Sequence, residues 1–517
     1  MTDQLVSLTE KYRHKIKTVA ELRAIFGPRP RSKRVIMCHG VFDVVHPGHL
    51  RHLLYAKSKA DILLASLTAD AHITKGQYRP HIPQDLRALN LAAFETVDYV
   101  VIDHNPTPID NIAALQPDYF AKGYEYTSEG LPPKTQEELD TLKSYGGEMI
   151  FTPGDIVYSS SRLINLAPPR IKLEKLLTLM EYEGLTFDSL RKHVASLNGV
   201  RVHVLGDTIV DSYTQTAMIG GQTKTPTMSV LYERRDDYIG GAAIVAKHLR
   251  AAGAEVIFST VLGEDGFKSF VLDGLKEAGV DCRPVIDPTR PTTNKNAIVA
   301  EGYRLLKIDT LDNRSISDDI VESLADSVSA TACDAVVYSD FRHGIFNRRT
   351  IPRLVSAIPA GTFKVADSQV ASRWGNITEF QGFDLITPNE REARFALGDQ
   401  DSGVRPLATA LYKAACCSTL ILKMGERGVL TCRSGGNEAI VVDTFVERLV
   451  DAVGAGDALL AYATLALRVS KSDTVATILG SIAAACECEY DGNIPVTPED
   501  VLRKIDSVER QAHYGDN

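Results

Sequence analysis

Two histidines stand three residues apart where a short apolar run gives way to a helical pattern. The segment from Cys38 to His49 reads CHGVFDVVHPGH, and its proline suits the first turn of a helix. Backbone N–H groups and the dipole at such a helix start favour an anion. Imidazole groups from His46 and His49 could hold a phosphate there while negative charge builds in a transition state. The zinc patterns H-E-x-x-H and H-x-x-E-H are absent from the sequence, and the spacing alone fits either a phosphate site or two surface histidines.

A second turn of small residues precedes a helical run near the carboxyl terminus. Residues 451–458 read DAVGAGDA, and the run ALLAYATLAL begins at Ala458. Small residues let backbone amides approach an anion at a helix start. Asp457 sits at this turn and could take a proton from an attacking hydroxyl. Taken alone, the pattern fits either an anion site beside a general base or a plain turn before a helix.

Short β-rich runs alternate with helical stretches in both halves of the chain, and these elements must position the two turns. In the first half we expect strands at 34–38, 62–67 and 99–102, and helices at 50–59 and 85–94. In the second half the expected strands are 200–205, 255–260, 335–338, 363–366 and 419–423, with helices at 242–252, 266–278 and 458–467. Strands that alternate with helices predict an α/β fold with parallel sheets and crossover connections.

The two alternating patterns predict two α/β domains joined head to tail. The first pattern ends near Leu163, and the run APPR at 167–170 breaks regular structure. We therefore expect an amino-terminal helical extension at 1–33, a first domain at 34–166, a linker at 167–196 and a second domain at 197–510.

The composition is that of a globular protein and excludes several classes of function. Of 517 residues, 44% are hydrophobic and 24% are charged. Lys and Arg number 57 against 66 Asp and Glu, and this net charge of −9 argues against a mainly electrostatic binder of nucleic acid or anionic membranes. We expect no secretory signal and no membrane span, because the longest apolar stretch is too short. Eight cysteines are too sparse for a disulfide scaffold, so we expect free thiols in a cytoplasmic protein.

The histidine segment resembles the G-x-F-D-x-x-H-x-G-H signature of cytidylyltransferase-like nucleotidyltransferases. Lys75-Gly76, the run DYFAKG at 118–123 and the serines at 159–161 resemble further segments of that family. The resemblance implies a Rossmann-like fold in which a sugar phosphate attacks the α-phosphate of a nucleoside triphosphate and pyrophosphate leaves, with Mg²⁺ bridging the phosphates. It assigns catalysis to His46, His49 and Lys75, and substrate contact to Asp43. It assigns the nucleotide, either ATP or CTP, to His39, Gly40, Phe42, Gly48, Lys122, Ser159, Ser160 and Ser161.

The carboxyl-terminal turn resembles the D-x-x-G-A-G-D signature of ribokinase-like sugar kinases of the PfkB family. The run GGAA at 240–243, the N-x-x-E spacing of Asn389 and Glu392, and the run KMGERG at 423–428 resemble further family segments in the same order. The resemblance implies a kinase that uses ATP and Mg²⁺, with Asp457 as base and Asn389 and Glu392 at the metal. It assigns the nucleotide to Lys423, Gly425, Gly428, Gly454, Ala455 and Gly456. It assigns the sugar to Asp207, Asp211, Gly240, Gly241, Lys295 and Asp340.

Two residues depart from the heptose kinase branch of that family, which the second half otherwise resembles. Ile244 stands where the family has asparagine, which removes a polar contact to a substrate hydroxyl. Gln369 stands where the branch has the lysine of an Asp-Pro-Lys segment, and glutamine cannot supply a fixed positive charge. A site built to hydrogen-bond one hydroxyl discriminates strongly, so these departures leave the sugar open.

Taken together, both halves resemble the bifunctional heptose 7-phosphate kinase/heptose 1-phosphate nucleotidylyltransferases, the ADP-heptose synthase family, with the two domains in reversed order. The resemblance implies phosphorylation of D-glycero-D-manno-heptose 7-phosphate at its anomeric hydroxyl, and nucleotidyl transfer to a sugar 1-phosphate. One alternative is another phosphorylated sugar or a polyol with CTP as the donor. A second is that one domain is a non-catalytic sugar-phosphate sensor. We expect small-molecule partners, no nucleic acid, no membrane, and a homo-oligomer that dimerises through the kinase domain.

Overall fold

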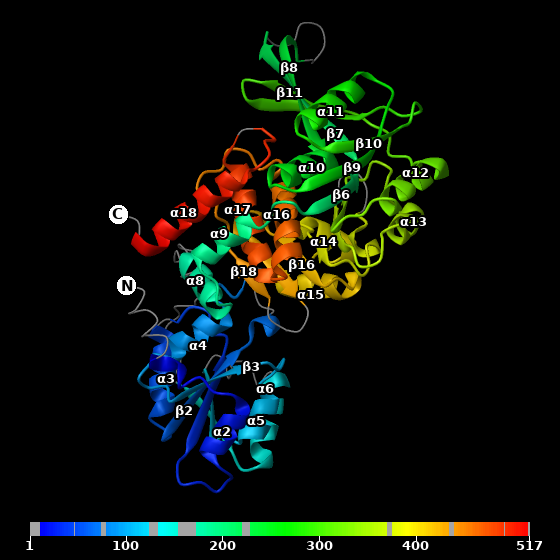
Figure 1. The fold of residues 1–517 in the computed structure, drawn as a ribbon. Helices are drawn as coiled ribbons and strands as arrows, with labels where there is room; N and C mark the ends of the chain where they lie inside the picture. Colours follow the sequence, from blue (N-terminus) through cyan, green and yellow to red (C-terminus); the bar gives the residue numbers. More distant parts are fainter. Residues whose placement is uncertain are drawn as a thin grey trace. The chain divides into compact units, whose positions relative to one another are not determined.

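The chain forms two compact units, Met1–Thr178 and Leu179–Asn517, and each is described by itself (Figure 1). The structure is a computed structural model. It describes residues 11–45, 47–73, 79–123, 133–152, 172–219, 228–369, 375–433, 439–490 and 492–514. Within these ranges, no helix combines the length and the apolar character needed to cross a bilayer.

The first unit is built on one parallel sheet with the strand order β3-β2-β1-β4-β5. Its strands are β1 (Val35–Gly40), β2 (Ile62–Thr68), β3 (Tyr99–Asp103), β4 (Tyr119–Gly123) and β5 (Glu148–Thr152). Its helices are α2 (Val19–Phe26), α3 (Pro47–Lys57), η1 (Asp70–His72), α4 (Gln84–Ala92), α5 (Ile109–Leu115), α6 (Pro133–Ser144) and the start of α8 (Lys172–Tyr182).

Helices cover both faces of this sheet, which explains why its strands are continuous apolar runs. Ile36 and Cys38 of β1 pack with residues of α3 and α4, in one buried cluster. Val35 and Met37 of the same strand pack with residues of α2, α5 and α6 in a second cluster. The alternation along β1 therefore joins two cores and leaves the carboxyl edge of the sheet for the turns that carry polar residues.

The second unit holds a nine-stranded sheet of order β10-β9-β6-β13-β14-β15-β16-β17-β18, parallel from β10 to β16 and antiparallel at its last two pairs. Its strands are β6 (Arg201–Gly206), β9 (Glu255–Leu262), β10 (Asp281–Ile286), β13 (Ala335–Asp340), β14 (Phe363–Ser368), β15 (Leu385–Ile386), β16 (Thr419–Lys423), β17 (Val429–Arg433) and β18 (Ile440–Val442). The helices are α9 (Phe187–Ala195), α10 (Ala242–Ala251), α11 (Gly266–Glu277), α12 (Asp318–Ser329), α13 (Thr350–Ser356), η3 (Ile377–Glu379), α14 (Glu390–Leu397), α15 (Val404–Ala415), η4 (Gly425–Arg427), α16 (Ala455–Ser470), α17 (Asp473–Cys488) and α18 (Pro498–Tyr514).

A separate four-stranded sheet of order β12-β11-β7-β8 belongs to the same unit and was not anticipated from the sequence. It consists of β7 (Thr208–Met218), β8 (Val230–Gly241), β11 (Thr293–Ala300) and β12 (Tyr303–Thr310). Figure 1 shows β8 and β11 of this sheet projecting beyond α10 and α11. Strand β7 begins two residues after β6 ends, and β8 runs directly into α10, so both ends of this hairpin are tied to the large sheet.

The α/β class predicted from the sequence is confirmed, and each strand and helix expected by its apolar pattern is present. The carboxyl part of the segment expected to link the domains forms α9, whose Leu190 is buried. Arg191 of α9 binds Asp506 of α18 with an Nη2–Oδ1 distance of 2.7 Å. Helix α9 therefore packs as part of the second unit, which begins at Leu179.

Candidate functional site

The kinase-type turn of the second unit holds Asp457 in the first turn of α16. Gly454 takes a positive φ of 86° just before the helix, a conformation that favours glycine. The Asp457 N–H donates to the Gly454 carbonyl at 2.9 Å, while the residue itself is only 9% exposed. Ala455 and Gly456 complete the helix start. Their backbone N–H groups are the first of the helix, where an anion is favoured.

Burial, together with the charges of Asp367 and Asp211, raises the pKa of the Asp457 carboxyl to about 8, while the Lys423 ammonium opposes the rise. A general base works best when its pKa lies near the working pH. Its burial, its place at a helix start and its raised pKa make Asp457 a candidate general base.

Lys423 ends strand β16 and forms an ion pair inside this site. Its Nζ atom lies 3.1 Å from Oδ1 and 3.3 Å from Oδ2 of Asp367. Asp367 lies near the end of β14, which is separated from β16 by β15. Asp367 is 2% exposed and also accepts a hydrogen bond from Thr387 Oγ1 at 3.0 Å. The carboxyl ends of parallel strands meet at one edge of a sheet, which brings these side chains together.

Asn389 and Glu392, the residues expected at the metal, form a capping box at the start of α14. Asn389 donates from Nδ2 to Glu392 Oε1 and from its backbone N–H to Oε2, both at 2.6 Å. Each carboxylate oxygen keeps a second lone pair, so the pair fits a hydrated Mg²⁺ reached through water. Within the described part of the chain, no group of three or more His, Cys, Asp or Glu side chains is arranged to hold a bare metal ion.

The four-stranded sheet brings two expected sugar-binding residues toward this site. Asp211 on β7 and Lys295 on β11 are partners in the parallel register and therefore share one face. Burial raises the pKa of Asp211, and the charge of Lys295 opposes the rise. Because Asp211 also raises the pKa of Asp457, the face that carries it lies within electrostatic reach of the base.

Gly240 and Gly241 allow the end of β8 to approach this face closely. A β-carbon on Gly240 would lie 2.3 Å from Asp211 Oδ2, and one on Gly241 would lie 2.4 Å from the Asp207 carbonyl oxygen. The glycines of the GGAA segment are thus required by the packing of β8 against β7 and the start of α10.

Asp207 and Asp340, also expected to bind sugar, are buried and accept hydrogen bonds from the protein itself. Asp207 Oδ2 accepts the N–H groups of Phe341 at 3.0 Å and His343 at 3.2 Å. Asp340 accepts hydrogen bonds from Ser368 Oγ at 2.7 Å and from Asn376 Nδ2 at 3.0 Å. Burial and the neighbouring Asp207 raise the pKa of Asp340 to about 7. In this arrangement, both carboxyl groups order the loop that follows β13.

A cavity of about 550 Å³ opens onto the cluster beside α14 and the η4 turn. It is lined by three expected residues, Asn389, Lys423 and Gly425, and by residues that sequence reasoning missed. Among these, the guanidinium carbon of Arg391 lies over the ring of Phe395, 5.6 Å from the ring centre. The cavity offers one flat apolar surface, one stacked cation and the lysine of the ion pair, a combination suited to a nucleotide.

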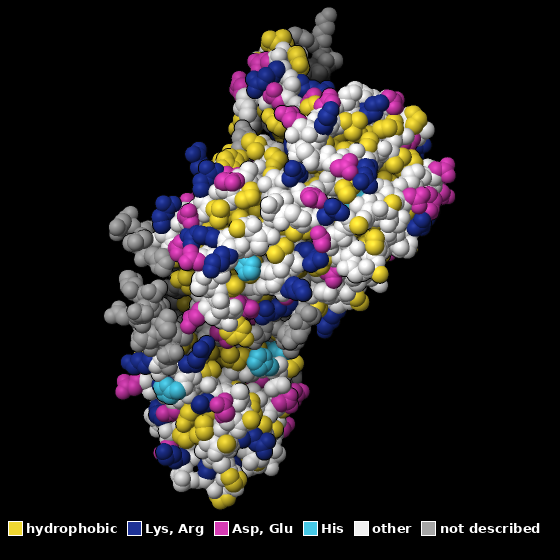
Figure 2. Space-filling view, viewed as in Figure 1, with side chains coloured by type: hydrophobic (Ala, Val, Ile, Leu, Met, Phe, Trp, Pro, Cys, Tyr) yellow, Lys and Arg dark blue, Asp and Glu magenta, His cyan; other side chains and the backbone are white. Residues whose placement is uncertain are grey.

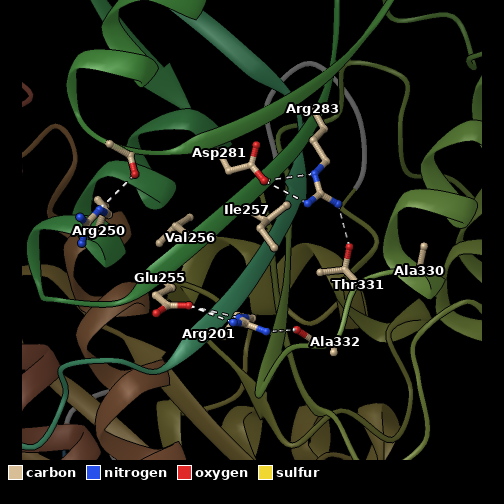
Figure 3. Close-up of a pocket in the computed structure, with 11 residues that line it drawn as sticks. Arg201, Arg250, Glu255, Val256, Ile257, Asp281, Arg283, Ala330, Thr331 and Ala332 are labelled. Carbon is tan, nitrogen blue, oxygen red and sulfur yellow. Dashed lines mark hydrogen bonds and ion pairs between the residues drawn. The ribbon is translucent and has the colours of Figure 1, made fainter.

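A second cavity, of about 470 Å³, lies at the opposite end of the strands (Figure 3). Arg201, Glu255 and Asp281 line it, and they begin β6, β9 and β10. Its guanidinium groups are held by the chain itself. Arg201 binds Glu255, and Arg283 binds Asp281 and Thr331 (Figure 3). This cavity is therefore separate from the cluster of Asp457, Lys423 and Asp367, because Lys423 and Asp367 lie at the carboxyl ends of their strands.

The histidine turn of the first unit is surrounded by polar groups from the ends of β1, β2 and β3. His39 contacts Ser66 Oγ through Nδ1 at 2.9 Å and Thr68 Oγ1 through Nε2 at 3.1 Å. Its Nδ1 atom lies 3.8 Å from the buried carboxylate of Asp103. Burial, with a smaller contribution from Lys122, lowers the pKa of His39 to about 4. His39 is thus a neutral imidazole that shapes the edge of the sheet.

Phe42, Asp43 and His49 stand where the turn enters α3. Phe42 is buried, with a positive φ of 48°, and its ring lies 5.3 Å from the His49 ring, centre to centre. Asp43 Oδ1 accepts the backbone N–H groups of His81 at 2.7 Å and Ile82 at 3.0 Å. Gly40 ends β1 against the Phe42 ring, and Gly48 lies in the first turn of α3.

Lys122 ends β4 and is paired within the unit. Its Nζ atom lies 2.5 Å from Glu138 Oε2 of α6 and 3.3 Å from Thr135 Oγ1. Burial raises the pKa of Glu138, which Lys122 opposes. The expected nucleotide-binding lysine is therefore held at the carboxyl edge of the sheet by one buried acid.

Sequence reasoning missed Arg87, whose side chain is completely buried. It binds the carbonyls of Val41, Thr68 and Ile82 and the Asp70 carboxylate. The arginine therefore ties the histidine turn to the end of β2 and the segment before α4. A lone arginine on an otherwise amphipathic helix gave no sign of this role.

Five of the residues expected in the first unit lie outside the described residues, namely His46, Lys75, Ser159, Ser160 and Ser161.

Comparisons with known proteins match each unit to an enzyme family. Residues 201–500 match the pfkB family of carbohydrate kinases, and residues 37–166 match the cytidylyltransferase-like family. The chain is 29% identical over 330 residues to the bifunctional protein HldE of Rhodopseudomonas palustris (strain HaA2) and 29% identical over 333 residues to that of Geobacter metallireducens. Each match covers 62% of this chain and 65% of the relative, which is just under two thirds of its length.

Solved structures share the fold of the second unit. Phosphofructokinase-2 from Escherichia coli, in complex with potassium, superposes with a TM-score of 0.51 at 17% identity, covering 60% of this chain and 100% of that one. The same enzyme in complex with substrates and products gives a TM-score of 0.51 at 18% identity, again over 60% of this chain and 100% of that one. At such identities the likeness concerns the fold alone.

Proposed function

Because the chain belongs to the pfkB family of carbohydrate kinases, we propose that its second unit transfers the terminal phosphoryl group of ATP to a hydroxyl of a phosphorylated sugar. The observation that carries this proposal is the burial of Asp457 in the first turn of α16, beside Lys423 and within reach of Asp211. The sugar hydroxyl gives its proton to Asp457 as its oxygen attacks the γ-phosphorus, and the bond to ADP breaks. The helix N–H groups at Gly454–Gly456 hold the charge that develops.

Mg²⁺ fits this site through water on the Glu392 carboxylate, with Asn389 holding that carboxylate in place. Bound there, the ion would neutralise charge on the phosphates of ATP. Glu392→Gln should therefore raise the Mg²⁺ concentration needed for half-maximal ATP binding, which is measured by calorimetry without any sugar. An unchanged Mg²⁺ requirement would remove Glu392 from the metal site.

We propose that the first unit joins a sugar 1-phosphate to a nucleotide. A phosphate oxygen of the sugar attacks the α-phosphorus of the nucleoside triphosphate, and pyrophosphate leaves. His49 and Lys122 lie at the carboxyl edge of the sheet, where this charge would be held. His46, Lys75 and the serines at 159–161 complete the set by family resemblance. ATP and CTP are the two candidate donors.

The substrate we favour for the kinase is D-glycero-D-manno-heptose 7-phosphate, phosphorylated at its anomeric hydroxyl. A phosphatase must then remove the 7-phosphate before nucleotidyl transfer can give an ADP-heptose. The alternative, another phosphorylated sugar or a polyol with CTP, is favoured by Ile244 and Gln369. Ile244 is fully buried in α10, and Gln369 lies next to Asp367 and Ser368 at the end of β14.

The deciding experiment is mass spectrometry of the purified chain incubated with this heptose phosphate, ATP and Mg²⁺. A bisphosphate product would support the heptose assignment. No product from the heptose, together with product from another sugar phosphate in a panel, would move the assignment to that sugar. The transferase is tested with ATP and CTP against sugar 1-phosphates, with pyrophosphate release as readout. Turnover by only one of the two units would support the sensor alternative for the other.

We also propose that the kinase unit forms a homodimer through its four-stranded sheet. Ile308 and Leu306 pair with Asn296 and Ile298 in the β11–β12 register, so they lie on the face opposite Lys295. These two side chains are 51% and 53% exposed. Figure 2 shows hydrophobic side chains among charged ones over β8, in the same sheet. Exposed apolar side chains gathered on one face are typical of an interaction surface.

Light scattering tests this dimer. Leu306→Asp should convert it to monomers, whereas Val469→Asp, an equally polar change at an exposed position of α16, should not. A monomeric wild-type chain would contradict the proposal.

We place the protein in the cytoplasm, where ATP is available and where its eight free cysteines would remain reduced.

A further inference from the structure

Lys423 lies between the cavity beside α14 and the start of α16, and its position suggests more than an internal ion pair. The side chain is 15% exposed and reaches Asp367 at 3.1 Å from the end of β16. The backbone of Lys423 is anchored as well, since its N–H donates to the Pro388 carbonyl at 2.8 Å. The ammonium is therefore held at a defined point rather than extended into solvent.

That point lies against the glycine turn at the start of α16. A β-carbon on Gly456 would stand 3.3 Å from Lys423 Nζ. The ammonium is thus next to the N–H groups that would receive a phosphoryl oxygen. Lys423 also lines the 550 Å³ cavity beside α14, so one side chain joins the cavity to the turn.

Lys423 interacts electrostatically with several acidic side chains. Burial lowers the pKa of the lysine, but the charges of Asp367, Glu392 and Asp457 raise it, and the net shift is upward. All three carboxylates are at most 9% exposed. An arriving phosphoryl group would add negative charge to this acidic site, and the lysine is the cation already in position to receive it.

We propose that Lys423 is a catalytic residue whose ammonium binds the γ-phosphoryl group of ATP during transfer, with Asp367 serving as its counter-ion when no phosphate is bound. The proposal rests on the kinase function proposed above. In the transfer step, the sugar oxygen–phosphorus bond forms, the bond to the ADP oxygen breaks, and the hydroxyl proton passes to Asp457. Lys423 stays protonated throughout and stabilises the equatorial oxygens of the moving group. Lys423 thus supplies a positive charge from the end of β16, whereas Gln369, which follows β14 and replaces a lysine of the related kinases, supplies none.

The test compares binding of Mg·ATP and Mg·ADP by titration calorimetry, because only ATP carries the group that Lys423 would hold. Lys423→Gln should weaken ATP binding by about tenfold to a hundredfold and ADP binding by about twofold at most, the loss expected for one charge-assisted hydrogen bond. An unchanged ratio of ATP to ADP affinity would overturn the proposal. That ratio is unchanged if neither affinity falls, and also if both fall equally, which would indicate a structural role only.

Two further variants keep the test decisive if removal of Lys423 unfolds the unit by leaving Asp367 unpaired. Lys423→Gln combined with Asp367→Asn removes both charges, and this double variant should still lose the preference for ATP. Asp367→Asn alone frees the lysine and should keep that preference. A purely structural ion pair predicts instead that the two single variants behave alike.

The failure of this inference can be told apart from the failure of the proposed function. A wild-type chain that binds neither nucleotide would overturn both. A wild-type chain that binds ATP but phosphorylates no sugar would overturn the kinase substrate assignment, while the ATP-to-ADP ratio of Lys423→Gln still judges the lysine.

Discussion

Gly240 and Asp211 are in such close contact across β8 and β7 that a β-carbon on the glycine would stand 2.3 Å from the Oδ2 atom of the aspartate. The contact sets the position of a carboxylate that acts on the charge of Asp457. The hairpin of the small sheet and the Asp457 carboxyl on α16 are therefore coupled through one residue without a side chain.

Gly240→Ala should displace Asp211 and weaken sugar binding. Loss of one well-placed carboxylate contact should raise the KM for the sugar phosphate by about tenfold or more. Steady-state kinetics at saturating ATP measures this effect. Gly266→Ala is the matched control, since a β-carbon there meets no atom within 4 Å. If Gly240→Ala and Gly266→Ala gave the same KM, Asp211 would not touch the sugar.

Asp457→Asn should abolish kinase turnover while ATP binding persists. Asparagine keeps the shape of the side chain but cannot accept the hydroxyl proton, and loss of a general base lowers rates by about 10²–10⁴-fold. Product formation is followed by mass spectrometry and nucleotide binding by calorimetry. Pyrophosphate release by the first unit is the internal control and should not change. Kinase turnover near the wild-type rate would contradict the assignment of the base.

Kinase activity should rise with pH through the pKa of Asp457, which is raised to about 8. The ionised form is the active base, so at limiting substrate the rate should fall about tenfold per pH unit below that value. Measurement of kcat/KM from pH 6 to 9 reports this limb. A flat profile across that range would show that ionisation of Asp457 does not control the step.

The same raised pKa has a consequence for stability. The folded state holds the Asp457 proton more tightly than the unfolded state, whose carboxyl titrates near 3.8. Stability from this group is therefore fully present below about pH 4 and is lost as pH rises toward 8. Asp457→Asn removes that loss, so its gain in melting temperature should be larger at pH 8 than at pH 5. An equal gain at both values would contradict the shifted pKa.

His49→Ala should lower pyrophosphate release by about 10²–10³-fold, the usual effect of removing one donor from developing charge. His46→Ala should act in the same way. A coupled phosphate assay measures release with ATP and CTP. Kinase turnover by the second unit serves as the control for intact protein, because that unit has its own site. Unchanged release by both variants would exclude the histidine turn from the chemistry.

Arg87→Met should destabilise the first unit by about 3–5 kcal/mol, because it leaves the Asp70 carboxylate without its buried partner. Arg87→Lys should rescue little, since one ammonium cannot reach the four acceptors that the guanidinium binds. Urea unfolding followed by loss of pyrophosphate release measures the effect. Kinase turnover by the second unit, followed in the same urea series, is the control and should be lost at an unchanged urea concentration.

Local sequence determined which residues end a strand or begin a helix and could therefore meet a phosphate. The apolar run before His39 and the small residues before Asp457 identify those junctions, because strand and helix patterns depend on spacing within a few residues. The α/β class and the strands expected in each half followed from such patterns, whereas the two enzyme families followed from the resemblance of whole motifs. Arg87 could not be recognised in this way, because its four partners come from separate turns.

Tertiary structure alone decided which charges meet. Lys423 and Asp367 are 56 residues apart and become partners only because the sheet order places β14, β15 and β16 side by side. The charge of Asp211 acts on Asp457 only because the four-stranded sheet brings the two residues close. The register of that sheet pairs segments that are distant in the chain. Pairing over such separations depends on the packing of whole elements rather than on local preference. Asn389 and Glu392 illustrate the division, since their spacing marked a resemblance to a family motif, while the structure showed that they form a capping box beside Lys423.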